Sequence, residues 1–228
     1  MDMVAMKNLW DNYKDALWET FPEFEKQPVW ADWTGKGGTR LTATVYTNDY
    51  FIKSRAVDIW DEKSCIYNNI LYPKTGANGW AGNLPCFGMD LMGFNENRVI
   101  IVFDFQHPVE HYLMSVPGLP KAEKDYRFFE MGNHFSENIF VRNCKMTEVD
   151  DHLDMFKQYL LEYKKLIEWE TPDGTNASET YRDFDNYMTR LDPVGPYLAG
   201  KFGKEQSEQL VKGFLFNYGT ESEPEQQS

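Results

Sequence analysis

Two neighbouring stretches of sequence decide the fold of this chain. They are residues 84–94, Leu84-Pro85-Cys86-Phe87-Gly88-Met89-Asp90-Leu91-Met92-Gly93-Phe94, and residues 98–106, Arg98-Val99-Ile100-Ile101-Val102-Phe103-Asp104-Phe105-Gln106. Both are apolar almost throughout, and the Asn95-Glu96-Asn97 segment between them has turn composition, so they predict two adjacent strands. Each strand nevertheless carries one aspartate near its middle. An ionised carboxylate in a core strand is costly unless it is paired or protonated, so Asp90 and Asp104 are the first candidates for chemistry.

Strand alternation separates the two faces of these strands. In the first strand Cys86, Gly88, Asp90 and Met92 point one way, and Phe87, Met89 and Leu91 point the other. Asp90 therefore shares its face with a glycine, a thiol and a thioether, which leaves room for a flat ligand. In the second strand Val102, Asp104 and Gln106 share one face. The alternative is that each aspartate is structural and bonds to a backbone or side-chain partner, and this alternative is stronger for Asp104.

Composition limits the class of protein. The 228 residues suffice for one core, and we expect a single domain over residues 1–219 followed by a disordered acidic tail, residues 220–228. The net charge of −13 opposes nucleic-acid binding. Three widely spaced cysteines predict neither a disulfide framework nor an iron–sulfur cluster. The sequence contains no basic-then-apolar leader and no apolar run of about 18 residues, so we expect a cytoplasmic protein without a membrane span.

The rest of the chain predicts helices before and after further strands. Amphipathic helices are expected over residues 7–21, about 147–169, 181–191 and about 205–216. Strands are expected over 40–47 and 50–60, with shorter pieces over 126–131 and 136–143, while 65–74 fits either strand or loop. This order predicts the α/β class, with a mostly antiparallel sheet between helical layers, a three-layer α/β/α sandwich.

Several common catalytic and binding motifs are missing from the sequence. The glycine-rich segment 75–83 lacks the spacing of a phosphate-binding loop or a dinucleotide fingerprint. The four histidines form no His-Glu-x-x-His zinc motif, and no Gly-x-Ser-x-Gly elbow occurs. No bound cofactor or metal is therefore expected, and electrons for any redox reaction would have to come from another protein.

Five segments in order along nearly the whole chain resemble the ferredoxin-dependent bilin reductases: residues 66–76, 84–92, 99–108, 126–136 and 184–193. The resemblance is greatest to phage-type members that make phycoerythrobilin. It implies a central antiparallel sheet between two helical layers, biliverdin IXα as substrate and a reduced [2Fe–2S] ferredoxin as external electron donor. It also implies a monomer, located in the host-cell cytoplasm if a phage encodes it.

The resemblance also implies roles for particular residues. Asp90 matches the sheet aspartate that protonates the tetrapyrrole, and Asp192 matches a C-terminal aspartate associated with the second reduction. Asn68 stands where relatives that form phycocyanobilin have histidine, which counts against that product. Besides these roles, strand alternation makes Gly88 and Met92 beside Asp90 candidates for substrate binding. Arg142 and Lys201 are candidates for neutralising the propionates, although a plain surface cation is the favoured reading of each.

Four functions are compatible with the sequence. The first is four-electron reduction of biliverdin IXα to phycoerythrobilin by way of 15,16-dihydrobiliverdin, in successive electron and proton transfers through radicals. The second stops at 15,16-dihydrobiliverdin after two electrons. The third is a bilin carrier without catalysis, and the fourth is a structural domain without ligand. Because ferredoxins are acidic, we expect basic residues near the pocket mouth, acidic residues in the tail and around 148–154, and turnover that falls with salt.

Overall fold

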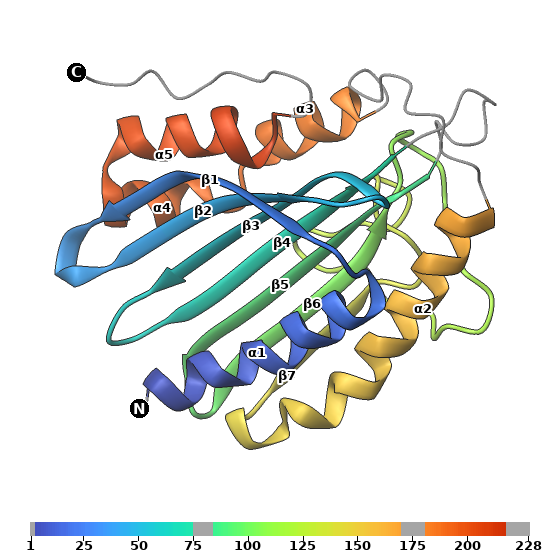
Figure 1. Ribbon diagram of the computed structural model, residues 1–228, viewed down its shortest axis with the longest axis horizontal. Coiled ribbons are helices and arrows are strands. Elements are labelled where there is room, and N and C mark those ends of the chain that lie inside the picture. The colour runs from blue at the N-terminus through green and yellow to red at the C-terminus, as the bar shows by residue number, and fades with distance from the viewer. Residues whose placement is uncertain (1–2, 75–83, 170–180, 218–228) are drawn as a thin grey trace.

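A computed structural model describes residues 3–74, 84–169 and 181–217. It contains one seven-stranded sheet in which each strand pairs antiparallel with the next strand along the chain (Figure 1). The strands are β1 (Glu25–Thr34), β2 (Arg40–Thr47), β3 (Phe51–Trp60), β4 (Cys65–Pro73), β5 (Cys86–Asn95), β6 (Arg98–Gln106) and β7 (Phe140–Cys144). The α/β class and the antiparallel sheet expected from the sequence are confirmed.

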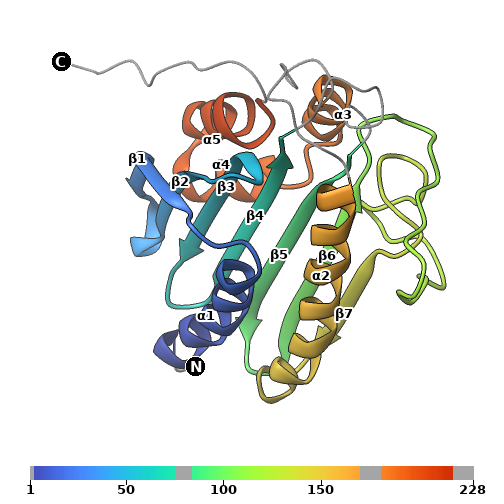
Figure 2. The same cartoon turned by 45° about the vertical axis from the view of Figure 1, so that its right-hand side comes forward.

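The helices come from the two ends of the chain and pack on opposite faces of the sheet (Figures 1 and 2). Helices α1 (Met3–Thr20) and α2 (Leu153–Trp169) contribute side chains to one core cluster with β3–β7. The opposite face packs against α3 (Arg182–Leu191), α4 (Gly195–Phe202), α5 (Lys204–Leu210) and the π-helical turn Val211–Leu215 that continues α5. Asp90 lies on the second of these faces.

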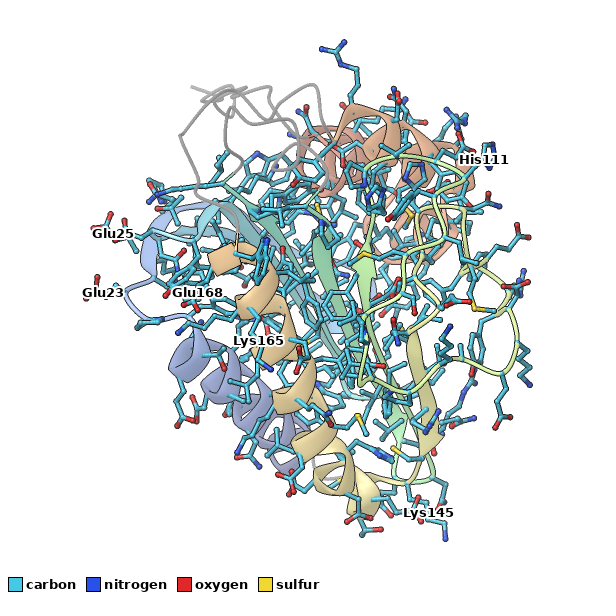
Figure 3. All side chains as sticks on the ribbon, turned by 90° about the vertical axis from the view of Figure 1, so that its right-hand side faces the viewer. Glu23, Glu25, His111, Lys145, Lys165 and Glu168 are labelled. Atoms are coloured by element: carbon cyan, nitrogen blue, oxygen red, sulfur yellow. The ribbon has the colours of Figure 1, made fainter. Side chains whose placement is uncertain are left out.

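The face under α1 and α2 is filled by aromatic rings. Phe103 stacks on Phe140 with ring centres 4.3 Å apart, and Phe87 stacks on Tyr163 of α2 at 5.3 Å. The Tyr163 hydroxyl is satisfied because it donates to the carbonyl of Pro85 at 2.8 Å. Figure 3 shows Lys165 and Glu168 on the outer side of α2, where both are exposed. This face is therefore a closed core, although the buried indole N–H of Trp10 has no hydrogen-bond partner among the described residues.

Most elements lie where the sequence predicts them. Strands 40–47 and 50–60 correspond to β2 and β3, and the stretch 65–74, for which the pattern left two possibilities, is the strand β4. The helix expected over 181–191 is α3, and the first helix buries Trp10, Tyr13 and Leu17 as its spacing predicts. The segments 75–83 and 170–180 and the expected acidic tail lie outside the described residues.

Four details differ from the sequence prediction. Strand β1 was not expected, and its pairing with β2 is interrupted by two register shifts around residues 26–31. Residues 126–131 form turns with isolated bridges, not a strand, and residues 136–139 precede β7. The helix expected from 147 begins with two 3₁₀ turns, where Glu148 caps the backbone N–H of Lys145 at 2.8 Å. Helix α4 begins at Gly195-Pro196, because proline fits the first helical turn.

Candidate active site

The central strands bring Asp90 and Asn68 directly opposite each other. Asn68 of β4 pairs with Asp90 of β5, and Asp90 pairs with Val102 of β6, so these three side chains form one row on the face covered by α3. In the neighbouring row Ile70 lies opposite Gly88, and Gly88 lies opposite Asp104. The face predicted from strand alternation therefore exists.

Asp90 is tied to its neighbour by one hydrogen bond. The amide nitrogen Nδ2 of Asn68 donates to Oδ1 of Asp90 at 2.6 Å, and no described residue donates to or accepts from Oδ2. Burial raises the pKa of Asp90, while the bond from Asn68 and the charge of Arg55 oppose that rise. Asp90 keeps part of its surface exposed, so its free oxygen remains accessible. It can hold a proton at higher pH than an ordinary aspartate.

Arg55 of β3 is a buried cation on this face that the sequence analysis did not single out. Only 1% of its surface is exposed, and its Nη1 donates to Oδ1 of Asn68 at 2.8 Å. The guanidinium lies 5.2 Å from the ring centre of Phe216, and its Nε has no hydrogen-bond partner among the described residues. No described carboxylate forms an ion pair with Arg55. The sequence could have pointed to Arg55, because it is a charged residue among Ser54, Ala56 and Val57 in a predicted strand, and a charge in a strand is what singled out the aspartates.

Gly88 does not leave an empty space beside Asp90. A Cβ atom at this position would collide with the side-chain amide of Gln106, which reaches diagonally from β6 across the glycine. The Oε1 atom of Gln106 is buried and has no partner in the part of the chain that the structure describes. The room expected above Gly88 is thus occupied by an unsatisfied amide, and whether Gly88 or Met92 touches substrate stays a prediction.

The surroundings of Asp104 fit a structural role, which the sequence offered as the alternative to a catalytic one. It is 1% exposed, and Ser136 donates to it twice, from Oγ at 2.5 Å and from the backbone N–H at 3.1 Å. Burial raises its pKa well above the ordinary value, and the two bonds from Ser136 only partly offset that effect. Asp104 therefore anchors the segment before β7 and has no free oxygen to offer a ligand.

A second cluster of charges lies at the end of this face nearest α3. Tyr72 donates to Asp185 of α3 at 3.0 Å, and Lys53 donates to the carbonyl of Asn217 at 2.9 Å. Burial, reinforced by the charge of Arg55, lowers the pKa of Lys53 to about 8. Two cations, Lys53 and Arg55, and three acids, Asp90, Asp104 and Asp185, thus share a face that also carries apolar side chains such as Ile70 and Val102.

The structure does not bring Asp192 together with Asp90. Asp192 ends α3 in a left-handed conformation (φ 43°, ψ 54°), is exposed, and accepts the N–H of Gly195 at 3.0 Å. It lines an outer groove of about 440 Å³ between α3, α4 and α5, with Lys204 and Lys212 among its neighbours. Its predicted catalytic role remains a prediction.

The two predicted propionate partners lie apart from the Asp90 cluster. Arg142 pairs across the sheet with Ile101, whose side chain belongs to the core under α1 and α2, so Arg142 is on the opposite face, where it lies over Phe140 at 4.5 Å. Lys201 of α4 forms an ion pair with the buried Asp61 at 2.5 Å. Any role of either cation toward a substrate stays a prediction.

These observations define a kind of site. An acid with a raised pKa and a free oxygen, together with two unpartnered buried atoms, Arg55 Nε and Gln106 Oε1, lies on an apolar sheet face. Such a face suits a flat conjugated molecule that has N–H and C=O groups along one edge and accepts protons. In residues 3–74, 84–169 and 181–217 no cluster of three metal-ligating side chains is found. Within the same residues no helix has the length and apolarity needed to cross a membrane.

Comparison with known proteins gives the family. The model of the ferredoxin-dependent bilin reductases matches residues 26–217, and the chain belongs to this family of enzymes. A 15,16-dihydrobiliverdin:ferredoxin oxidoreductase from Gloeobacter violaceus is 24% identical over 80% of each chain. A phycoerythrobilin:ferredoxin oxidoreductase from Prochlorococcus marinus (strain AS9601) is 26% identical over 84% of this chain and 83% of its own. The crystal structure of tomato phytochromobilin synthase in complex with biliverdin has the same fold. It matches with a TM-score of 0.67 at 15% identity, over 91% of this chain and 82% of that one.

Proposed function

We propose that this protein reduces biliverdin IXα to phycoerythrobilin by way of 15,16-dihydrobiliverdin, with a reduced [2Fe–2S] ferredoxin as electron donor. The observation that carries the proposal is the Asn68–Asp90 pair, with its bond of 2.6 Å and the raised pKa of Asp90 on an apolar face. The family match and the names of the relatives support the substrate class.

The chemistry requires protons as well as electrons. Reducing one double bond of the tetrapyrrole consumes two electrons from ferredoxin and two protons, and each one-electron step makes the pigment a stronger base. A buried carboxylic acid beside the pigment can deliver a proton from its free oxygen and be reprotonated from solvent before the next step. Asp90 fits this role, because Oδ1 is held by Asn68 while Oδ2 is unpartnered among the described residues. Asn68 itself does not titrate and holds the acid in place.

The orphaned polar atoms support binding of a tetrapyrrole on this face. Arg55 Nε is a donor suited to a lactam carbonyl, and Gln106 Oε1 is an acceptor suited to a pyrrole N–H. The pigment would lie between the sheet and helices α3–α5. The pigment's propionates would then lie at the rim. Lys201 stays a candidate there only if its side chain leaves Asp61, whereas Arg142 lies on the opposite face of the sheet.

A specific observation favours the two-electron reaction as the second candidate. Relatives named for 15,16-dihydrobiliverdin and for phycoerythrobilin match the chain at similar identities, 24% and 26%. Asp192, the acid proposed for the second reduction, lines the groove between α3, α4 and α5 and accepts its hydrogen bond from Gly195. If Asp192 does not enter the site, the reaction stops after the first double bond.

Anaerobic turnover tests the proposal. Biliverdin IXα, ferredoxin and its reductase are mixed with the protein, and the absorbance of the product is followed. Phycoerythrobilin as final product supports the four-electron reaction, and 15,16-dihydrobiliverdin as final product supports the two-electron one. A shifted but unreduced biliverdin spectrum would identify a carrier, and an unchanged spectrum would leave no bilin function.

Substituting Asp192→Asn then tests the second acid. We expect the variant to accumulate 15,16-dihydrobiliverdin, because only the second proton delivery is lost. A variant that still forms phycoerythrobilin at the wild-type rate would remove Asp192 from the mechanism. The matched control is Asp183→Asn, which changes another exposed acid of α3.

A further inference from the structure

Three polar side chains follow one another across three neighbouring strands of the sheet. Arg55 of β3 donates to Asn68 of β4 at 2.8 Å, and Asn68 donates to Asp90 of β5 at 2.6 Å. Each residue contacts the next through one defined atom pair, and this series of hydrogen bonds ends at Asp90, whose other oxygen is free. Nothing in the predicted role of Asn68 requires Arg55.

The orientation of an amide is decided by its partners. Asparagine carries an acceptor oxygen and a donor nitrogen on one planar group, and it can present either to a neighbour. A guanidinium has donors only and stays charged in proteins, so the Asn68 atom that faces Arg55 has to be the oxygen. The nitrogen must then face Asp90. Without Arg55 the amide could turn over and accept a proton from the carboxylic acid.

The orientation of Asn68 in turn selects the oxygen of Asp90 that carries the proton. Oδ1 accepts the N–H of Asn68 and cannot hold a proton in the same direction, so the acid proton belongs on Oδ2. Oδ2 is the oxygen without a partner in the described residues. A flipped amide would instead place the proton between Asp90 and Asn68, away from any ligand.

We infer that Arg55 is the positioning residue of this site: it fixes Asn68 as a donor and so keeps the transferable proton of Asp90 on Oδ2. The part of this inference that concerns catalysis rests on the proposed function. The part that concerns the three side chains holds for the protein without ligand.

Other charged or titratable groups surround Arg55, and one of them, Lys53, supplies the control. Lys53 is the neighbouring cation on the same face of β3, Asp185 reaches in from α3, and Tyr72 and Cys86 lie on β4 and β5. Lys53 donates to the carbonyl of Asn217 and not to Asn68. Loss of Lys53 therefore removes a nearby positive charge without releasing the amide. A comparison of the two cations separates positioning from general electrostatics.

The first experiment titrates Asp90 in the ligand-free protein by carboxyl ¹³C NMR. In Arg55→Met we expect its midpoint to rise by about one pH unit or more, because a cation and an oriented donor are both lost. Arg55→Lys keeps a charged, donor-only group and should restore most of the midpoint. Lys53→Met should move it less than half as far. An unchanged midpoint in Arg55→Met, or an equal shift in Lys53→Met, would overturn the inference.

A double-mutant cycle tests whether Arg55 acts through Asn68. Asn68→Ala should raise the Asp90 midpoint in the wild-type background and raise it clearly less in the Arg55→Met background. Additive shifts would mean that Arg55 acts on Asp90 by charge alone, which contradicts the positioning role. Circular dichroism checks folding, and Arg55→Gln, an uncharged group that can still fill the space, replaces Arg55→Met if that variant does not fold.

The last measurement separates this inference from the proposed function. Turnover that needs protonated Asp90 should fall as pH rises through its midpoint, and Arg55→Met should shift that fall to higher pH. If the wild type reduces biliverdin but Arg55→Met titrates like wild type, the positioning role fails alone. If the titrations behave as expected and no protein reduces biliverdin, the proposed function fails alone.

Discussion

The adjacent asparagines of β4 lie on opposite faces of the sheet, and their amides have different kinds of hydrogen-bond partners. Asn69 points under α1 and α2, where it donates to the hydroxyl of Tyr67 at 2.9 Å and accepts from Ser54 at 3.1 Å. Asn68 points under α3 and connects a buried arginine to an aspartic acid. One amide completes a neutral network, and the other joins two groups that are costly to bury.

The two sides of strand β4 therefore serve different purposes: one contributes to the packed core, and the other carries the candidate site. The face under α1 and α2 is closed by aromatic packing, and among its described residues the indole N–H of Trp10 is the one buried side-chain polar atom without a partner. The face under α3–α5 keeps an acid with a raised pKa and two buried atoms, Arg55 Nε and Gln106 Oε1, that have no partner in the described parts of the chain. A site that must bind and protonate a ligand retains such unsatisfied groups, and the opposite face supplies the stability that tolerates them.

The largest expected effect is on the chemical step. Asp90→Asn removes the proton donor, and we expect anaerobic reduction of biliverdin to slow by roughly 10²–10⁴-fold. Thermal unfolding of the variant should remain close to that of the wild type, because a costly buried acid is replaced by a neutral amide. The control Asp104→Asn changes the other strand aspartate, which contacts only the segment around Ser136, and should keep its turnover. Equal losses in both variants would contradict the distinction between the two acids.

The second effect concerns stability on the other face. Phe103→Ala removes a buried ring that stacks on Phe140 and contacts Phe156 and Tyr159 of α2. We expect the free energy of unfolding in urea to fall by about 3–5 kcal/mol. The Asp90 titration should be unchanged in the folded protein. A shifted Asp90 midpoint would show that the two faces are coupled.

The adjacent amides provide the sharpest pair of substitutions. Asn69→Ala leaves Tyr67 and Ser54 without their partner and should cost about 1–3 kcal/mol in urea unfolding, with Asp90 titrating as in wild type. Asn68→Ala should raise the Asp90 midpoint. The comparison fails if both variants, or neither, move that midpoint.

The pH dependence of stability tests Asp104. Its folded pKa lies above the ordinary value of 3.8, so the folded state binds the proton more tightly than the unfolded chain does. The stabilisation is complete at pH below the unfolded pKa and is lost as pH rises through the folded pKa. Asp104→Asn should therefore lose less free energy of unfolding than the wild type between acidic and neutral pH, measured by urea unfolding. A parallel pair of curves would rule out the raised pKa.

The smallest expected effect is that of salt on turnover. If an acidic ferredoxin docks on a basic surface, raising the ionic strength from low to physiological should slow turnover by less than about tenfold. The exposed acids at 150, 151 and 154 lie around the start of α2 and should not affect the encounter with ferredoxin. The variant Asp151→Asn, which removes one of these charges, therefore serves as the control. A rate that does not depend on salt would remove charge attraction from the encounter.

Periodicity predicted most of the fold because most elements have one clearly buried side. Strand β1 was missed because it is an edge strand with Pro28 inside the first of its two register shifts, and only Ala31 is buried along it. Helix α4 was missed because Pro193 and Pro196 resemble a helix stop, although Pro196 lies in the first turn of a new helix.

The site was predictable only in part. Asp90 was found because a charge in an apolar strand is rare, and Asn68 was assigned by resemblance. Their contact, and those of Arg55 and Gln106, depend on cross-strand register, which sets diagonal neighbours that a single sequence does not reveal. Arg142 could have been placed correctly, since alternation from Phe140 puts it on the α2 face.

The strand order has a consequence for how the protein is made. Each strand lies beside the strand that precedes it in the sequence, so the sheet assembles from successive hairpins with short loop closures while synthesis proceeds from the N-terminus. Helix α1 is synthesised before the sheet and is available for the aromatic face, whereas residues 181–217 leave the ribosome last. The nascent sheet therefore spends this interval with Lys53, Arg55 and Asp90 facing water. Because charges interrupt apolar strands that would otherwise associate, we expect the groups that prepare the site for chemistry to limit aggregation of the incomplete protein as well.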